Sequence, residues 1–198
     1  MAGFVWPLVL EHGDITLRPM RWSDRKEWQA VRERNREWLG PWESTPPDGV
    51  KRSVRFVDML LAVRKQARAG LMLPLVIEYR GQLVGQITLG NIVWGSLRQG
   101  YIGYWIASEV AGRGITTTAV AMLTDHALLD MGLHRVEINI RPENAASVRV
   151  VEKNGFHLEG LRPRYLHIDG DWRDHHCYVM TSESLLSGGI TRLRPVSH

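Results

Sequence analysis

The spacing of apolar and polar positions changes along the chain, and the first part is expected to hold a strand and two helices. In residues 14–20, Ile15 and Leu17 alternate with polar neighbours, which is typical of a strand. A helix is expected from an N-cap at Ser23 to about Leu39, because the Gly-Pro pair that follows stops a helix.

A second helix is expected from about Lys51 to Ala69, after a loop that is rich in proline. Val54, Val57 and Leu61 recur at the spacing of one side of a helix. We therefore expect these three side chains to form its apolar face.

The middle of the chain changes to the pattern of strands, with many β-branched and aromatic residues. Three strand-like runs lie at residues 73–79, 82–93 and 100–108, and the sequence YRGQ between the first two is typical of a hairpin turn. A helix is expected after the third run. The apolar residues on its expected face are Ala119, Met122, Leu123 and Ala127.

The last part is expected to add a short strand at RVEINI and a short helix capped by Asn144 and Gly155. An antiparallel strand pair around residues 169–171 completes the order β-α-α-β-β-β-α-β-α-β-β, with no repeat and no linker. Helices around a largely antiparallel sheet make a mixed α/β (α+β) fold. We expect one domain over residues 1–185 and a C-terminal tail at 186–198.

Composition restricts the class of protein further. With 198 residues, 44% of them hydrophobic and 23% charged, the chain fits a soluble globular domain. The single cysteine, Cys177, excludes an intrachain disulfide and fits a reducing, cytoplasmic location. No apolar run has the length of a membrane span, so no membrane partner is expected. The net charge of +4 comes from scattered residues, so a phosphate-bearing cofactor explains it as well as nucleic acid does.

The segment YWIASEVAGRGITTTAV passes from a strand pattern through Gly112, Arg113 and Gly114 into a helix pattern. The first turn of a helix has unpaired N–H groups and a partial positive charge, and glycines let a ligand approach them. The segment therefore indicates either a tight turn or a phosphate site with donors in residues 115–118. Its spacing matches neither the P-loop nor the dinucleotide-binding fingerprint.

Two further motifs accompany these glycines: Asn144 and Ser147 lie on the first turn of the short helix, and EKNGF follows them. Together they resemble two characteristic segments of the GCN5-related N-acetyltransferase (GNAT) superfamily. The stretches NREWLGPWESTPP, IGYWI and EGLRPRYLHIDGDWRDHHCYVM resemble the ribosomal-protein alanine N-terminal acetyltransferases, the RimJ/RimL group. The resemblance extends from about Ile15 to Met180.

The resemblance implies a GNAT-like acyl-CoA N-acyltransferase fold, with a mostly antiparallel splayed sheet, that binds acetyl-CoA. The backbone of Ile106 and Ala107 would pair with the pantetheine arm. Asn144 would hydrogen-bond this arm, and Ser147 would stand near the sulfur as general acid. The residues that would cradle the pyrophosphate are Gly112, Arg113, Gly114, Ile115 and Thr116. The strands with QITLG and YIGYWI would splay apart, so that the thioester meets an amine from the opposite side.

One residue departs from the pattern of the family. Glu109 stands where the family usually has Gln or Arg, and a carboxylate beside a pyrophosphate is unfavourable. We expect its side chain to point away from the phosphates, with backbone amides carrying the binding.

The implied activity is direct acetyl transfer to an amine, without a covalent enzyme intermediate and without a metal. The acceptor is expected to be a protein α-amino group, with a ribosomal protein as one option. At pH 7 roughly 10–15% of such a group is neutral, against on the order of 0.04% of a lysine amine, so a modest base suffices. The alternatives are a small amine (an aminoglycoside, a polyamine or an amino acid) and a non-catalytic acyl-CoA-binding or RNA-associated module.

The residues on the acceptor side are harder to assign from the sequence. Glu43, in the loop PWESTPP, is either a general base or a solvated carboxylate, and Tyr165 is either an alternative acid or a core residue. Trp38 and Trp42 flank this loop, where rigid aromatic rings are expected to frame a narrow entrance for a peptide end. Cys177 is expected to be a strand residue and not a nucleophile.

Overall fold

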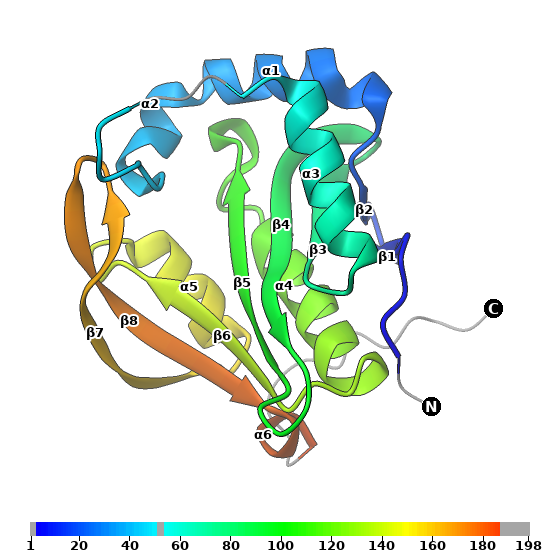
Figure 1. Cartoon of the computed structure of the whole chain (residues 1–198), viewed down its shortest axis with the longest axis vertical. Helices are drawn as coiled ribbons and strands as arrows, with labels where there is room; N and C mark the ends of the chain where they lie inside the picture. Colours follow the sequence, from blue (N-terminus) through cyan, green and yellow to red (C-terminus); the bar gives the residue numbers. More distant parts are fainter. Residues whose placement is uncertain (1–2, 51–53, 187–198) are drawn as a thin grey trace.

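The computed structural model describes residues 3–50 and 54–186, which hold eight strands in one sheet. The strands are β1 (Leu10–His12), β2 (Ile15–Pro19), β3 (Leu73–Tyr79), β4 (Gln82–Val93), β5 (Gln99–Ile106), β6 (Arg135–Ile140), β7 (His157–Ile168) and β8 (Asp171–Thr181). They lie in the order β1-β2-β3-β4-β5-β6-β8-β7, and only β5 and β6 are parallel neighbours (Figure 1). The expected mixed fold with a mostly antiparallel sheet is thereby confirmed.

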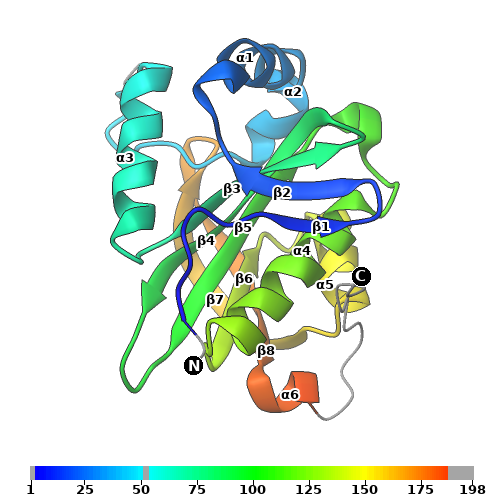
Figure 2. The same cartoon turned by 90° about the vertical axis from the view of Figure 1, so that its right-hand side faces the viewer.

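Helices flank the sheet on both faces. They are α1 (Arg25–Arg34), α2 (Arg36–Leu39), α3 (Phe56–Arg68), α4 (Ile115–Asp125), α5 (Ala145–Lys153) and α6 (Ser182–Leu186). Figure 2 shows α3 on one face and α4 and α5 on the other, while α1 and α2 lie across one end of the strands. Among the helices of the described residues, none is long and apolar enough to cross a membrane.

The predicted first helix is interrupted. Two helices, α1 and α2, meet at Asn35, and the residue that caps α1 is Asp24, not Ser23. Ser23 lies inside a short 3₁₀ turn, Trp22–Asp24. The prediction of one helix was therefore wrong in its cap and in its continuity.

The predicted apolar face of the second helix was also wrong. Its buried residues are Phe56, Leu60 and Ala67, whereas Val57 and Leu61 are 39% and 53% exposed. The helix carries two neighbouring apolar stripes. The stripe that contains the Phe56 ring buries more surface against the sheet than the stripe of Val57 and Leu61. The expected start at Lys51 lies outside the described residues.

The sheet opens between β5 and β6. These strands pair only from Gln99 with Arg135 to Tyr101 with Glu137, and then diverge (Figure 1). Strands β4 and β5 stay paired as far as Gly85 with Ile106. The predicted opening between QITLG and YIGYWI was therefore wrong: those segments form an antiparallel hairpin, whereas β5 and β6 are joined by a helical crossover.

Candidate active site

The glycine segment forms a tight turn that starts α4. Gly112 and Gly114 have φ of 78° and 82°, in the left-handed region that favours glycine, and Gly114 caps the helix. The first hydrogen bond of the helix runs from the Thr118 N–H to the Gly114 carbonyl at 3.0 Å. The N–H groups of Ile115 and Thr116 precede it and have no partner within the helix, so the turn presents donors suited to an anion.

The Glu109 side chain is held by residues at the junction of α1 and α2. Its carboxylate accepts a hydrogen bond from Asn35 Nδ2 at 3.1 Å and one from Arg34 Nε at 3.4 Å. Its own backbone N–H, Asn35 and Arg34 together lower the pKa of Glu109 below its ordinary value. Arg113 folds back within the turn and donates to the Glu109 carbonyl at 3.0 Å.

Asn35 is a residue of this region that the sequence did not reveal. Its side chain is almost completely buried, at 1% exposure. Its carboxamide oxygen accepts from Ser108, and its NH₂ group donates to Glu109 and to the carbonyl of Val31 at 3.0 Å. Asn35 thus joins the α1–α2 junction to the segment before the glycine turn.

Asn144 and Ser147 lie together at the start of α5. The Asn144 Oδ1 atom accepts from the Ser147 N–H at 3.1 Å, which is a standard helix cap. This use of the oxygen leaves the Asn144 NH₂ group for a ligand, and no hydrogen bond within the described residues involves it. The side chain of Ser147 lies beside the hydroxyl of Tyr104 on β5.

A pocket of about 310 Å³ lies between α1, α2 and the end of β5, which all supply lining residues. Its lining residues are Arg32, Leu39, Trp42, Glu43, Ser44, Tyr104 and Trp105. Glu43 forms an ion pair with Arg32. The guanidinium of Arg32 also stacks over Trp105, 5.3 Å from the ring centre, and over Trp28 at 5.8 Å. Glu43 is therefore held at the pocket wall and is not a free loop carboxylate.

Trp38, on α2, precedes the loop PWESTPP, and Trp42 lies in the 3₁₀ turn at its start; both are anchored to the rest of the site. Trp38 Nε1 donates to the Ile106 carbonyl at 3.1 Å, at the end of β5. The Arg141 guanidinium lies 5.3 Å from the centre of the Trp42 ring and donates to the Pro41 carbonyl at 2.7 Å. Both tryptophans are thus held in place by residues at the ends of β5 and β6, and their role as an entrance for a peptide end stays a prediction.

A second contact holds the far end of this loop. The Thr45 N–H donates to the His167 carbonyl at 2.9 Å, and the Thr45 hydroxyl lies 2.8 Å from His167 Nδ1. Ser44 forms a β-bridge with Ile168. The β7–β8 hairpin therefore positions the loop that closes the pocket.

Tyr165 lies apart from the residues above. On β7 it accepts a hydrogen bond from Arg162 at 3.3 Å and packs edge-on against His175, with 5.7 Å between ring centres. No contact in the described part of the chain joins it to Ser147 or Glu43. Its proposed part in catalysis stays an untested prediction.

Cys177 is buried on β8, as expected for a strand residue. Burial and the nearby carboxylates of Glu137 and Glu159 raise the pKa of its thiol. These three side chains lie close enough to hold a metal ion. Arg135 already pairs with both carboxylates and Arg162 pairs with Glu137, so the group is an ion-pair network.

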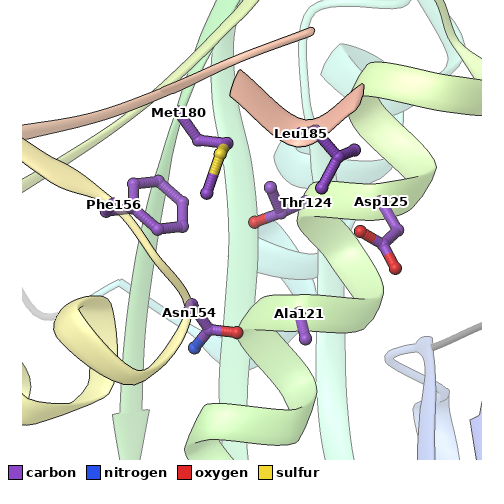
Figure 3. A pocket seen from close by; sticks show the side chains of 7 residues that line it. All are labelled: Ala121, Thr124, Asp125, Asn154, Phe156, Met180 and Leu185. Carbon is purple, nitrogen blue, oxygen red and sulfur yellow. The ribbon is translucent and has the colours of Figure 1, made fainter. Parts of the chain in front are cut away.

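A smaller cavity, of about 10 Å³, lies between α4, α6 and β8 (Figure 3). Ala121, Thr124, Asp125, Asn154, Phe156, Met180 and Leu185 line it. Asn154 bridges two helices here, donating to the Thr117 carbonyl at 3.2 Å and to Val150 at 2.8 Å. The cavity has room for about one water molecule, so it belongs to helix packing and not to substrate binding.

The fold, the glycine turn and the Asn144–Ser147 cap together define a class of acyl-CoA-dependent transferases. Residues 14–157 match the acetyltransferase (GNAT) domain, and the chain belongs to this family of N-acetyltransferases. It is 29% identical over 173 residues to the probable N-acetyltransferase YjcK of Bacillus subtilis, covering 84% of this chain and 93% of that protein. It is also 29% identical to the ribosomal protein uS5-alanine N-acetyltransferase of Escherichia coli, covering 83% and 87%.

Solved structures agree with the family assignment. The structure of RimJ from Mycobacterium smegmatis in complex with CoA-disulfide has a TM-score of 0.85 and 39% identity, covering 93% of this chain and 96% of that one. The ribosomal-protein-S5-alanine acetyltransferase of Vibrio fischeri has a TM-score of 0.79 and 27% identity, covering 89% and 97%. The predicted resemblance to the RimJ/RimL group is therefore confirmed, and the Mycobacterium smegmatis neighbour holds a CoA-disulfide.

Proposed function

We propose that the protein acetylates the α-amino group of a protein N-terminus, with ribosomal proteins as the first candidates. One observation carries this proposal. Among the residues that line the pocket, the only carboxylate is Glu43, and Arg32 neutralises it. A pocket for polyamines or aminoglycosides needs unpaired negative charge, whereas aromatic walls suit a peptide end. The names of the relatives from Escherichia coli and Mycobacterium smegmatis point the same way.

The donor is proposed to lie along the opening between β5 and β6. The backbone of Ile106 would pair with the pantetheine arm, whereas the Ala107 N–H already donates to the Val84 carbonyl at 2.8 Å. The NH₂ group of Asn144 would hydrogen-bond the arm. The pyrophosphate would take the free N–H groups of the turn. The residues proposed for this cradle are Gly112, Arg113, Gly114, Ile115 and Thr116. A cytoplasmic location remains the expectation from the sequence.

The reaction needs a neutral amine and a protonated leaving group. The amine nitrogen forms a bond to the thioester carbon, and the carbon–sulfur bond then breaks. Ser147 gives its hydroxyl proton to the sulfur and regains one, through water, from Glu43, which has first taken it from the amine. Glu43 is proposed to orient the amine at the pocket wall and to accept that proton, with Tyr165 as the weaker candidate for the acid.

A panel of acceptors tests the proposed substrate. The protein is incubated with acetyl-CoA and either alanine- or serine-initiated hexapeptides, aminoglycosides, polyamines or amino acids, and free thiol is measured. Thiol release with the peptides supports the proposal, and release with small amines alone would overturn it. CoA binding without turnover on any acceptor would favour a binding module.

Substitution of Ser147 tests its role as acid. Ser147→Ala should lower kcat by roughly 10- to 100-fold while leaving the Kd for CoA within twofold. Ser96→Ala, at an exposed turn position, is the matched control and should change neither value. Equal losses in kcat and in CoA affinity would refute the assignment.

A further inference from the structure

Tyr104 stands at the opening of the sheet, although no sequence motif assigned it a role. It lies on β5 after Tyr101, which is the last residue of this strand that pairs with β6. Its ring packs against the main hydrophobic core. It also lines the acceptor pocket together with Trp42 and Glu43. Tyr104 therefore connects the acceptor side of the opening with the α5 side.

The hydroxyl of Tyr104 is buried and makes no well-formed hydrogen bond within the described residues. Buried hydroxyl groups nearly always have a partner, because desolvating one without compensation is costly. An unpaired hydroxyl inside a catalytic opening indicates that its hydrogen bond is completed during function. Ser147 is the polar side chain next to this hydroxyl.

Ser147 is fixed by its backbone and not by its hydroxyl. Its N–H is held by Asn144 Oδ1 at 3.1 Å, at the start of α5. A serine hydroxyl rotates freely unless a neighbour occupies one of its lone pairs. A donor beside the Oγ atom would therefore decide the direction of the Ser147 proton.

We propose that Tyr104 is a positioning residue for Ser147: its hydroxyl donates a hydrogen bond to Ser147 Oγ and directs the Ser147 proton toward the sulfur of the acetyl donor. The inference rests on the proton-donor role proposed above for Ser147. Tyr104 keeps its own proton throughout, so no further atom is transferred. A hydrogen bond accepted by Ser147 Oγ also polarises its O–H bond and makes it a better donor.

The electrostatics of the site agree with a permanent donor. Burial raises the pKa of Tyr104 to about 12, although the neighbouring Ser147 acts against this rise. The phenol is then protonated over the whole range in which an α-amino group reacts.

A double-mutant cycle tests the inference, with Tyr104→Phe, Ser147→Ala and the double variant. Tyr101→Phe is the matched control, because Tyr101 lies on the same strand and is 41% exposed. We measure kcat, the Kd for CoA by calorimetry, and the melting temperature of the free protein. Tyr104→Phe should lower kcat roughly tenfold and change neither the Kd nor the melting temperature. In the Ser147→Ala background it should have no further effect.

The other outcomes overturn the inference in distinguishable ways. An equal fall of kcat in both backgrounds would mean that Tyr104 acts directly on the substrate. An unchanged kcat would leave it without a role, and a lower melting temperature with parallel loss of activity would make it structural. If alanine-initiated peptides are not acetylated, the proposed acceptor is wrong. The cycle is then measured with the small amine that reacts fastest, since the leaving thiolate is the same.

Discussion

Asn35 and Ser108, which are 73 positions apart in the sequence, are joined by two hydrogen bonds. The carboxamide oxygen of Asn35 accepts from the Ser108 N–H at 2.8 Å and from the Ser108 hydroxyl at 2.7 Å. Ser108 lies between the end of β5 and the glycine turn, while Asn35 lies between α1 and α2. The pair therefore couples the segment before the glycine turn to the helices beside the pocket that Glu43 lines.

Removal of the Asn35 side chain should affect both stability and donor binding. Asn35→Ala removes a buried side chain together with its hydrogen bonds to Ser108, Glu109 and Val31, which costs about 1–3 kcal/mol of the free energy of unfolding. Because the glycine turn loses a support, the Kd for CoA should also rise severalfold. Urea unfolding and calorimetry measure the two effects. Gln29→Ala, at an exposed position of α1, is the control and should change stability by less than about 0.5 kcal/mol. A stable variant with unchanged CoA affinity would contradict the coupling.

Gly114 offers a second test of the donor site. Its φ of 82° is unfavourable for any residue with a Cβ, so Gly114→Ala should destabilise the protein by about 1–2 kcal/mol. The strained turn should also present its N–H groups poorly, so CoA should bind more weakly. Gly160→Ala is the matched control, because no atom lies within 4 Å of a Cβ there and its φ is not positive. If Gly114→Ala bound CoA normally, the turn would not be the phosphate cradle.

Local signals account for the parts of the fold that the sequence predicted well. The hairpin at YRGQ depends on Arg80 and Gly81, whose φ of 53° and 76° suit a tight turn between two strands. The cap at Asn144 and the glycine turn before α4 are equally local. The break at Asn35 was not predictable, because the hydrogen bonds that fix it come from Ser108, far along the chain.

The difference between local signals and long-range contacts also explains which residues of the candidate site were predicted. Donor-side residues such as Gly114 and Asn144 carry their own turn or cap chemistry, so a sequence motif reveals them. The Arg32–Glu43 ion pair and the burial of the Tyr104 hydroxyl arise from tertiary packing alone, so no sequence motif reveals them. The opening between β5 and β6 was likewise misplaced, since strand pairing is a long-range property.

Asp24, at the start of α1, should make the stability of the protein fall at acidic pH. Burial alone would raise the pKa of Asp24, but hydrogen bonds from Arg18 and from the Arg21 N–H outweigh it and hold the pKa below the ordinary 3.8. A lowered folded pKa stabilises the protein above the unfolded pKa, and this contribution is lost as the pH falls through the folded value.

Asp24→Asn should therefore lower the free energy of unfolding by about 2–3 kcal/mol at pH 7, because Arg18 loses a buried partner. The difference from the wild type should shrink as the pH falls below 3.8, which urea unfolding at a series of pH values measures. Asp58→Asn, in an exposed pair with Arg55, should have little effect. A difference that does not depend on pH would exclude this linkage.

Trp38 is 43% exposed, yet its indole N–H donates to the Ile106 carbonyl at 3.1 Å. The bond ties α2, where the acceptor loop begins, to the end of β5. Trp38→Phe keeps an aromatic wall but loses this bond, which is worth about 1 kcal/mol. The KM for an acceptor peptide should therefore rise roughly fivefold, while the KM for acetyl-CoA stays the same.

Trp94→Phe is the matched control for this substitution, because the Trp94 indole makes a similar bond, to the Gly70 carbonyl at 3.3 Å, away from the pocket lining. It should leave both KM values unchanged. Steady-state kinetics with each substrate varied in turn distinguish the outcomes. If Trp38→Phe instead tightened CoA binding, the indole would be competing with the pantetheine arm for the Ile106 carbonyl. Trp38 would then be a group that the donor displaces, and not a support for the acceptor loop.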